Sequence, residues 1–92
     1  MNKGELVTKL AKDSGTTKKD AEAVLNSFMD TVGEVLAEGD KISLVGFGTF
    51  ETSERSARKG RNPQNGKEIE IPAKTLPKFK AGKTLKEKVD QG

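Results

Sequence analysis

The stretch GFGTFETSERSARKGRNPQNGKEIEIP, residues 46–72, decides the fold. Residues 52–67 hold only two apolar side chains, too few for a buried sheet. Ile69, Ile71 and Ala73 then alternate with other residues, which is the period of a β-strand. The pattern predicts a long β-hairpin whose two limbs are both solvated.

The turn of this hairpin is expected at Asn62-Pro63-Gln64-Asn65-Gly66. Proline presets the backbone for an early turn position, and Asn and Gly tolerate the left-handed conformation. A hairpin centred on the middle of this turn places Arg58 opposite Glu70. The same centre places Glu54 opposite Lys74, unless a bulge shifts the register.

Charge is distributed unevenly along the chain. Residues 1–40 carry five lysines and eight acids, a net charge of −3, whereas residues 41–92 carry twelve basic residues and six acids, a net charge of +6. The hairpin lies in the basic half, and no acid occurs between residues 55 and 67. Because isolated two-stranded ribbons are marginal in water, we expect this one to become ordered against a partner, and its charge indicates a polyanion.

A specific order of glycine, proline, aromatic and basic residues runs through the hairpin and beyond it. It comprises GFGTF at residues 46–50, Arg55, Arg58, the run Gly60–Gln64, Gly66, Pro77, Phe79, Gly82 and Lys83. In order and spacing the whole chain resembles the bacterial histone-like HU family and its relative, integration host factor. The GRNPQ tip is the most specific part of this likeness.

The resemblance implies a function and an assembly. Members of the family are dimers whose two arms embrace DNA in the minor groove, and the proline at each arm tip wedges into a base step. For this chain it implies an α+β fold with two N-terminal helices, a three-stranded antiparallel sheet with a long β-hairpin arm, and a short C-terminal helix, in an intertwined dimer. We expect one domain over residues 1–92, with a helical dimerisation region at 1–40 and a sheet region at 41–92 whose arm spans about 53–74.

Two helices are predicted before the hairpin. Asn2 and Glu5 form a capping-box-like start, followed by apolar residues at helical spacing until Ser14-Gly15. A second start at Thr17 opens an apolar stripe of about five turns that closes at Gly39. Both stripes fit an ordinary core, and a groove for a partner helix is the alternative.

The remaining elements follow from alternation and from breakers. Residues 41–45 predict a strand, and residues 46–48 a tight turn into the next one. A third strand is expected from about Glu68 to Lys80; its prolines cannot donate ladder hydrogen bonds, so it should be an edge strand or bend there. Residues 83–89 predict a short terminal helix.

Size and composition favour an oligomer. About seventy residues remain outside the arm, and a core of that size seldom supplies more than about 3 to 5 kcal/mol without a further constraint. The chain has no Cys and no His, which excludes disulfides and argues against structural zinc. Gly33 is compatible with close helix approach in a dimer, or with an ordinary surface position. The predicted dimer core consists of Phe28, Leu44, Phe47, Phe50 and Phe79.

Each residue type in the predicted DNA interface has a physical role. Arginines can contact phosphates or enter a narrowed minor groove, lysines supply salt-dependent phosphate contacts, and Asn or Gln can reach base acceptors. Pro63 is the wedge by the family likeness alone, because the residues themselves favour a proline that merely shapes the turn. Simple solubility is the competing interpretation for the terminal-helix lysines. The predicted contacts are Arg55, Arg58, Lys59, Arg61, Asn62, Pro63, Gln64, Asn65, Lys67, Lys74, Lys80, Lys83, Lys86 and Lys3.

Other functions find little support. Without His or Cys the usual general base and the strongest nucleophile are missing, so we expect no enzyme, and we expect no metal or cofactor. No apolar run suggests a leader or membrane span, so the expected location is the cytoplasm and the nucleoid. The expected partners are double-stranded DNA, preferably bent, nicked or gapped, and a second copy; RNA stays open. The alternatives are a sequence-preferring DNA-bending subunit like integration host factor and, in a different class, a strand-adding protein-interaction module.

One tip residue departs from the family pattern. Position 65, usually Thr in the family, is Asn in this chain and is followed by Gly66. We expect the change to alter the flexibility of the tip and the group that it presents to DNA.

Overall fold

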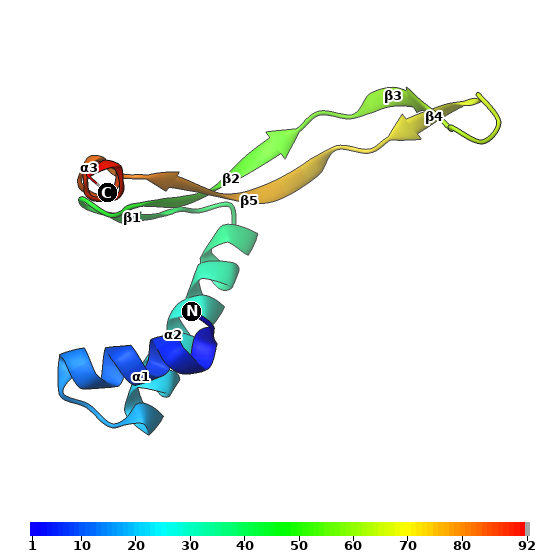
Figure 1. The fold of residues 1–92 in the computed structure, drawn as a ribbon. Coiled ribbons are helices and arrows are strands. Elements are labelled where there is room, and N and C mark those ends of the chain that lie inside the picture. Colours follow the sequence, from blue (N-terminus) through cyan, green and yellow to red (C-terminus); the bar gives the residue numbers. More distant parts are fainter. Residues whose placement is uncertain (92) are drawn as a thin grey trace. The chain divides into compact units, whose positions relative to one another are not determined.

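The computed structural model describes residues 1–91 and divides into two compact units, Met1–Val35 and Leu36–Gly92. Gly92, which the predicted domain includes, lies outside the described residues. Within residues 1–91, three helices and five strands follow in the order α1, α2, β1, β2, β3, β4, β5 and α3 (Figure 1).

The helices at the start of the chain begin where the caps predict. Helix α1 spans Lys3–Ser14, and the backbone N–H of Glu5 donates to Oδ1 of Asn2 at 2.9 Å. Helix α2 spans Lys18–Ala37, and the N–H of Asp20 donates to Oγ1 of Thr17 at 3.1 Å. These side chains satisfy backbone donors that have no partner inside a helix.

The first unit has a small core. Val7 and Ala11 of α1 and Ala21 of α2 are buried, with Leu25 packed against them. Beside this core lies an open apolar groove of about 410 Å³, lined mainly by Leu10, Ala21, Val24, Leu25 and Phe28. The two helices therefore cover only part of their apolar stripes within a single chain.

The second unit is built on an antiparallel sheet in the order β1-β2-β5. Strand β1 spans Ile42–Leu44, β2 spans Gly48–Arg55 and β5 spans Lys74–Ala81. The predicted strand at residues 41–45 was one residue too long at each end, because Val45 already belongs to the turn that the bond from Phe47 N–H to Leu44 O closes at 3.0 Å. Strand β5 is an edge strand, which accommodates its internal proline.

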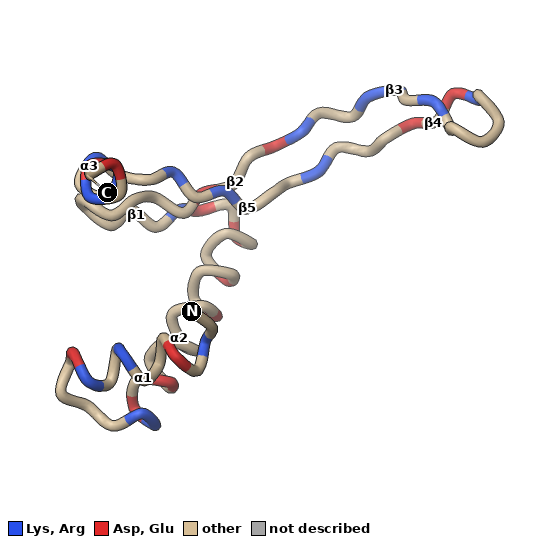
Figure 2. Tube along the Cα trace, in the orientation of Figure 1, with Lys and Arg blue, Asp and Glu red and all other residues tan. Residues whose placement is uncertain are grey.

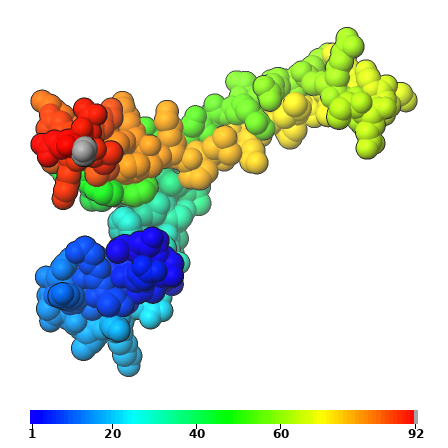
Figure 3. All heavy atoms as spheres, in the orientation of Figure 1, coloured from blue at the N-terminus to red at the C-terminus, as the bar shows by residue number. Residues whose placement is uncertain are grey.

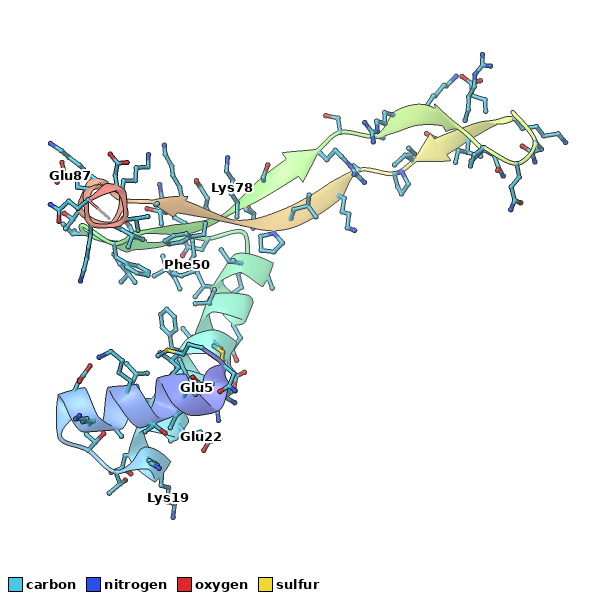
Figure 4. The ribbon with its side chains drawn as sticks, viewed as in Figure 1. Glu5, Lys19, Glu22, Phe50, Lys78 and Glu87 are labelled. Atoms are coloured by element: carbon cyan, nitrogen blue, oxygen red, sulfur yellow. The ribbon has the colours of Figure 1, made fainter. Side chains whose placement is uncertain are left out.

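The sheet has one aromatic face. The ring centroids of Phe50 and Phe79 are 4.8 Å apart, and those of Phe47 and Phe79 are 5.4 Å apart. Gly48 allows this packing, since a Cβ on it would lie 2.5 Å from Cζ of Phe79 and 2.6 Å from the Lys80 carbonyl oxygen. Phe50 and Lys78 point to opposite faces of the sheet (Figure 4).

Helix α3, Lys83–Asp90, is fixed to the β1–β2 turn by backbone bonds. The N–H of Gly82 donates to the carbonyl of Phe47 at 2.8 Å, and the N–H of Leu85 donates to that of Gly46 at 3.1 Å. The glycine-rich turn thereby positions the terminal helix and its lysines.

Candidate nucleic-acid interface

The arm continues the sheet as a second, two-stranded ladder. Strand β3 spans Arg58–Arg61 and pairs with β4, Glu68–Ile71 (Figure 1). The strand predicted from about 68 to 80 is thus divided into β4 and β5 at residues 72–73, where a bend at Pro72 was expected. A proline lacks the N–H that a continuous ladder needs.

No residue is inserted across this gap. Arg55 pairs with Lys74 on the sheet side, and Arg58 pairs with Ile71 on the arm side. Each limb therefore has two residues in the gap: Ser56 and Ala57 on one limb, and Pro72 and Ala73 on the other. The arm is one hairpin in a single register, with a short interruption rather than a bulge.

The tip is a turn braced by two asparagines. The backbone N–H groups of Gln64 and Lys67 donate to Oδ1 of Asn62 and of Asn65, both at 2.9 Å. Between the limbs, the N–H of Asn62 donates to the Lys67 carbonyl and the N–H of Gly66 donates to the Asn62 carbonyl, both at 2.8 Å. The predicted turn is confirmed. The side-chain oxygen of Asn62 is engaged within it, whereas none of these four bonds involves the side-chain nitrogen of Asn62.

The predicted register was wrong by one residue. Arg58 lies opposite Ile71 and not Glu70, and Glu54 lies opposite Thr75 and not Lys74. The ladder closes on Asn62 and Lys67, so the centre of the turn falls between Gln64 and Asn65 and not on Gln64. A shift of one residue exchanges every cross-strand partner.

This register gives the two faces of the β3–β4 ladder different chemistry. On one face Lys59 lies opposite Glu70, and Arg61 lies opposite Glu68. On the other face Arg58 lies opposite Ile71, and the Ile side chains flank Gly60: a Cβ there would approach Cδ1 of Ile71 to 3.0 Å. The predicted arm cations are therefore divided, and Arg58 shares its face with no acid of this ladder.

The arm cations are solvated. The basic residues of both limbs are exposed, and within residues 1–91 none of them lies within ion-pair distance of an acid. Figure 2 shows basic residues recurring along the arm, and Figure 3 shows the arm as a ribbon whose visible side no other element of the second unit covers. Charges presented in this way are available to an external anion.

The predicted lysines outside the tip occupy different elements. Lys74 and Lys80 lie on β5, on the face opposite the aromatic rings. Lys83 and Lys86 lie on α3, where Nζ of Lys83 is 3.9 Å from Oε1 of Glu87, an exposed pair that holds the lysine only weakly. Lys3 begins α1 in the first unit, whereas all the other predicted contacts lie in the second unit.

One further basic residue of the sheet was not among the predicted contacts. Lys78 lies on the same face of β5 as Lys74 and Lys80 and is exposed (Figure 4). The signal for it was present in the sequence, because residues two apart on a strand share a face. Three lysines therefore line this face of β5.

Neither a metal cluster nor a membrane-spanning helix occurs in the part of the chain that the structure describes. Residues 1–91 contain no group of three or more His, Cys, Asp or Glu side chains placed to hold a metal ion. None of the helices in this range is long and apolar enough to cross a membrane.

Comparison with known proteins identifies the family. The family profile described as "Bacterial DNA-binding protein" matches residues 1–90. The chain belongs to the bacterial DNA-binding protein family. It is 56% identical over 91 residues to the DNA-binding protein HU of Clostridium pasteurianum, covering 99% of this chain and 100% of that protein. It is 57% identical over 89 residues to the DNA-binding protein HU 1 of Bacillus subtilis, covering 97% of each.

A solved structure agrees with the fold. The HU of Anabaena, in a cocrystal structure with DNA, is 51% identical and superposes with a TM-score of 0.90 over 100% of both chains. The α+β fold with two N-terminal helices, a three-stranded sheet, an arm and a terminal helix is confirmed, as is the family resemblance. The family is described by DNA binding and not by a catalytic activity.

Proposed function

We propose that this chain is a histone-like protein that binds DNA largely without regard to sequence and bends it with two arms. The observation that carries the proposal is the arm itself, a solvated hairpin with five basic residues and no acid from Arg55 to Lys67. The basic residues along the arm can contact the phosphates of the DNA backbone, and such contacts carry no sequence information. The relative from Anabaena, whose structure was solved with DNA, has the same fold over its full length.

The tip suits the minor groove. Pro63 is exposed at the end of a turn that the two asparagines brace from within. A proline held in this way can enter a base step and widen it. The arginines of the arm would be attracted by the negative potential of a narrow minor groove. Base contacts by Gln64 and by the Asn62 amide would add little discrimination, since the minor groove distinguishes bases poorly.

We further propose that the functional unit is a homodimer. Large apolar side chains stay exposed in the single chain: Phe28 at 39%, Leu44 at 38%, Phe47 at 46% and Phe79 at 40%. No large side chain among the described residues is fully buried. A second copy would cover the predicted dimer core and the apolar groove beside α1, and would provide the second arm.

The proposal extends to the setting in which the protein acts. Smoothly bending a 20 to 30 base-pair site by 40 to 90° costs of order 1 to 6 kcal/mol, so the protein should prefer DNA that is already bent, nicked or gapped. Holding such geometries would compact DNA in the nucleoid, within the cytoplasm, without catalysis. RNA is a weaker second candidate ligand, because its charge is similar but its grooves differ.

Substitutions in the arm test the mode of binding. Arg58→Ala and Arg61→Ala should weaken binding about equally on unrelated duplexes. Each should also reduce the dependence of log Kd on log salt by about one for every phosphate that the variant no longer neutralises. Glu68→Gln is the matched control: it removes the acid opposite Arg61 and should strengthen binding.

The measurement is a fluorescence-anisotropy titration on two scrambled sequences at several salt concentrations. A loss confined to one sequence would favour a sequence-preferring protein of the integration host factor type. Binding that does not respond to salt would favour a strand-adding interaction module and would contradict the DNA proposal.

A further inference from the structure

The arm tip contains an asparagine that is chemically exceptional within this chain. Four asparagines occur, at positions 2, 26, 62 and 65, and only Asn65 precedes a glycine. The backbone nitrogen of the following residue can attack the side-chain carboxamide of asparagine, and a glycine, which has no Cβ, hinders this attack least. From the sequence alone Asn65 is therefore the most reactive of the four.

The geometry of the turn supports the reaction. The side-chain oxygen of Asn65 accepts the Lys67 N–H at 2.9 Å, a bond that polarises the carboxamide and can stabilise the oxyanion formed when its carbon is attacked. Gly66 has a φ of 67° and is exposed at the tip, with no atom within 4 Å of where its Cβ would be. The Gly66 N–H donates to the Asn62 carbonyl at 2.8 Å, and this bond must open before attack. Bonds at a solvated tip open at low free-energy cost.

We propose that Asn65–Gly66 is a site of spontaneous deamidation that weakens the arm's hold on a polyanion. The Gly66 nitrogen loses its proton to solvent base and attacks Cγ of Asn65, and a C–N bond forms. The side-chain nitrogen takes up a proton from solvent, its bond to Cγ breaks, and ammonia leaves. Water then hydrolyses the resulting succinimide to aspartate or isoaspartate. No oxidant, reductant or enzyme is required.

The product changes the electrostatics of the tip. No acid occurs between Arg55 and Lys67, so an aspartate at position 65 would be the first, and it would lie between Arg61 and Lys67. The negative charge of this aspartate would repel the phosphates of a polyanion near Pro63. The isoaspartate form also lengthens the backbone inside a turn held by four hydrogen bonds. This second step, the loss of binding, rests on the proposed function, whereas the chemistry does not.

The other asparagines are internal controls. Asn62 precedes Pro63, whose nitrogen carries no proton and cannot attack. Asn26 lies within α2, where the backbone is held in helical geometry, and Asn2 caps α1 through its side-chain oxygen. Neither of these two precedes a glycine, so both should react much more slowly.

The chemical test is a storage experiment on the full-length protein. Samples held at mildly alkaline pH are digested with trypsin, which releases Asn62–Lys67, and fragment ions assign the amide-to-acid mass gain to one of its two asparagines. We expect conversion at Asn65, faster at higher pH, with Asn2, Asn26 and Asn62 largely intact. The same peptide, stored free in solution, is the reference. If Asn65 converts in the free peptide but stays intact in the protein, the proposal is overturned.

The functional test measures the affinity of the protein for DNA over the same storage period. The affinity of the unaltered protein should fall several-fold as Asn65 converts, and the salt slope should decrease in magnitude by about one per arm. Asn65→Ser blocks the reaction, so its affinity, whatever the starting value, should stay constant on storage. Conversion without loss of affinity would overturn the functional half. Fresh protein that binds no DNA would refute the proposed function while the mass measurement still decided the chemistry.

Discussion

Single residues of this chain fix close approaches that a side chain would block. Gly48 is buried where β2 meets the aromatic cluster, and its φ is 158°. Gly33 is the opposite case, because no atom lies within 4 Å of where its Cβ would be. Two glycines that look alike in the sequence thus have different reasons to be there.

We predict that Gly48→Ala lowers the free energy of unfolding by about 1 to 3 kcal/mol, the usual cost of inserting a methyl group into a packed site. The added Cβ would meet the Phe79 ring and the Lys80 carbonyl. Thermal and chemical denaturation followed by circular dichroism measure the change. Equal stability of the variant and the unaltered protein would contradict this packing.

Gly33→Ala is the matched control. It should raise stability by roughly 1 kcal/mol, since alanine is the better helix former and the position is open. A marked loss of stability would instead show that another chain approaches α2 closely at Gly33, which the dimer interpretation allows.

At the scale of elements, local chemistry was readable from the sequence. Asn2 and Thr17 cap their helices as predicted, Gly66 adopts the left-handed conformation at the tip, and the prolines mark an edge strand and a break. Each of these signals affects only residues that are close to it in the sequence. The fold class followed from them and from the family likeness.

The register of the arm could not be read in the same way. It depends on whether the turn closes around an odd or an even number of residues, and NPQNG is compatible with both. The ladder closes on Asn62 and Lys67 around four residues, so every pairing moved by one. The sequence therefore could not predict which residues share a face of the arm, including the placement of Arg58 on the face opposite Lys59 and Arg61.

We predict that the gap in the arm is its most mobile internal point. Amides of Ser56, Ala57 and Ala73 should exchange with deuterium faster than those of the β2–β5 ladder, because no ladder bonds hold them and Pro72 has no N–H to contribute. Hydrogen exchange read by NMR measures this directly. Protection at the gap equal to that of β2 and β5 would show a continuous, rigid arm.

At the scale of the whole molecule, the decisive feature is what one chain leaves uncovered. Among the described residues the buried apolar side chains are few, namely Val7, Ala11, Ala21 and Leu36. A core of this extent supplies little stability on its own, so association should contribute a large share of it.

We predict that Phe47→Ala dissociates or unfolds the dimer, at a cost of about 3 to 5 kcal/mol for loss of a large aromatic anchor. Val45→Ala, a fully exposed position in the same turn, should change stability by no more than about 0.5 kcal/mol. Sedimentation and denaturation at several protein concentrations distinguish dissociation from unfolding. A stable, monomeric Phe47→Ala protein would contradict the place of Phe47 in the core.

DNA bending by the two arms is the central claim, and a competition titration tests it most directly. An intact duplex of scrambled sequence competes with the same duplex carrying a nick or a gap, at two salt concentrations. We predict tighter binding to the interrupted duplex and a steep loss of affinity with salt on both, because the interruption removes part of the bending cost. Equal or negligible binding to the two duplexes would contradict bending and the wedge role of Pro63.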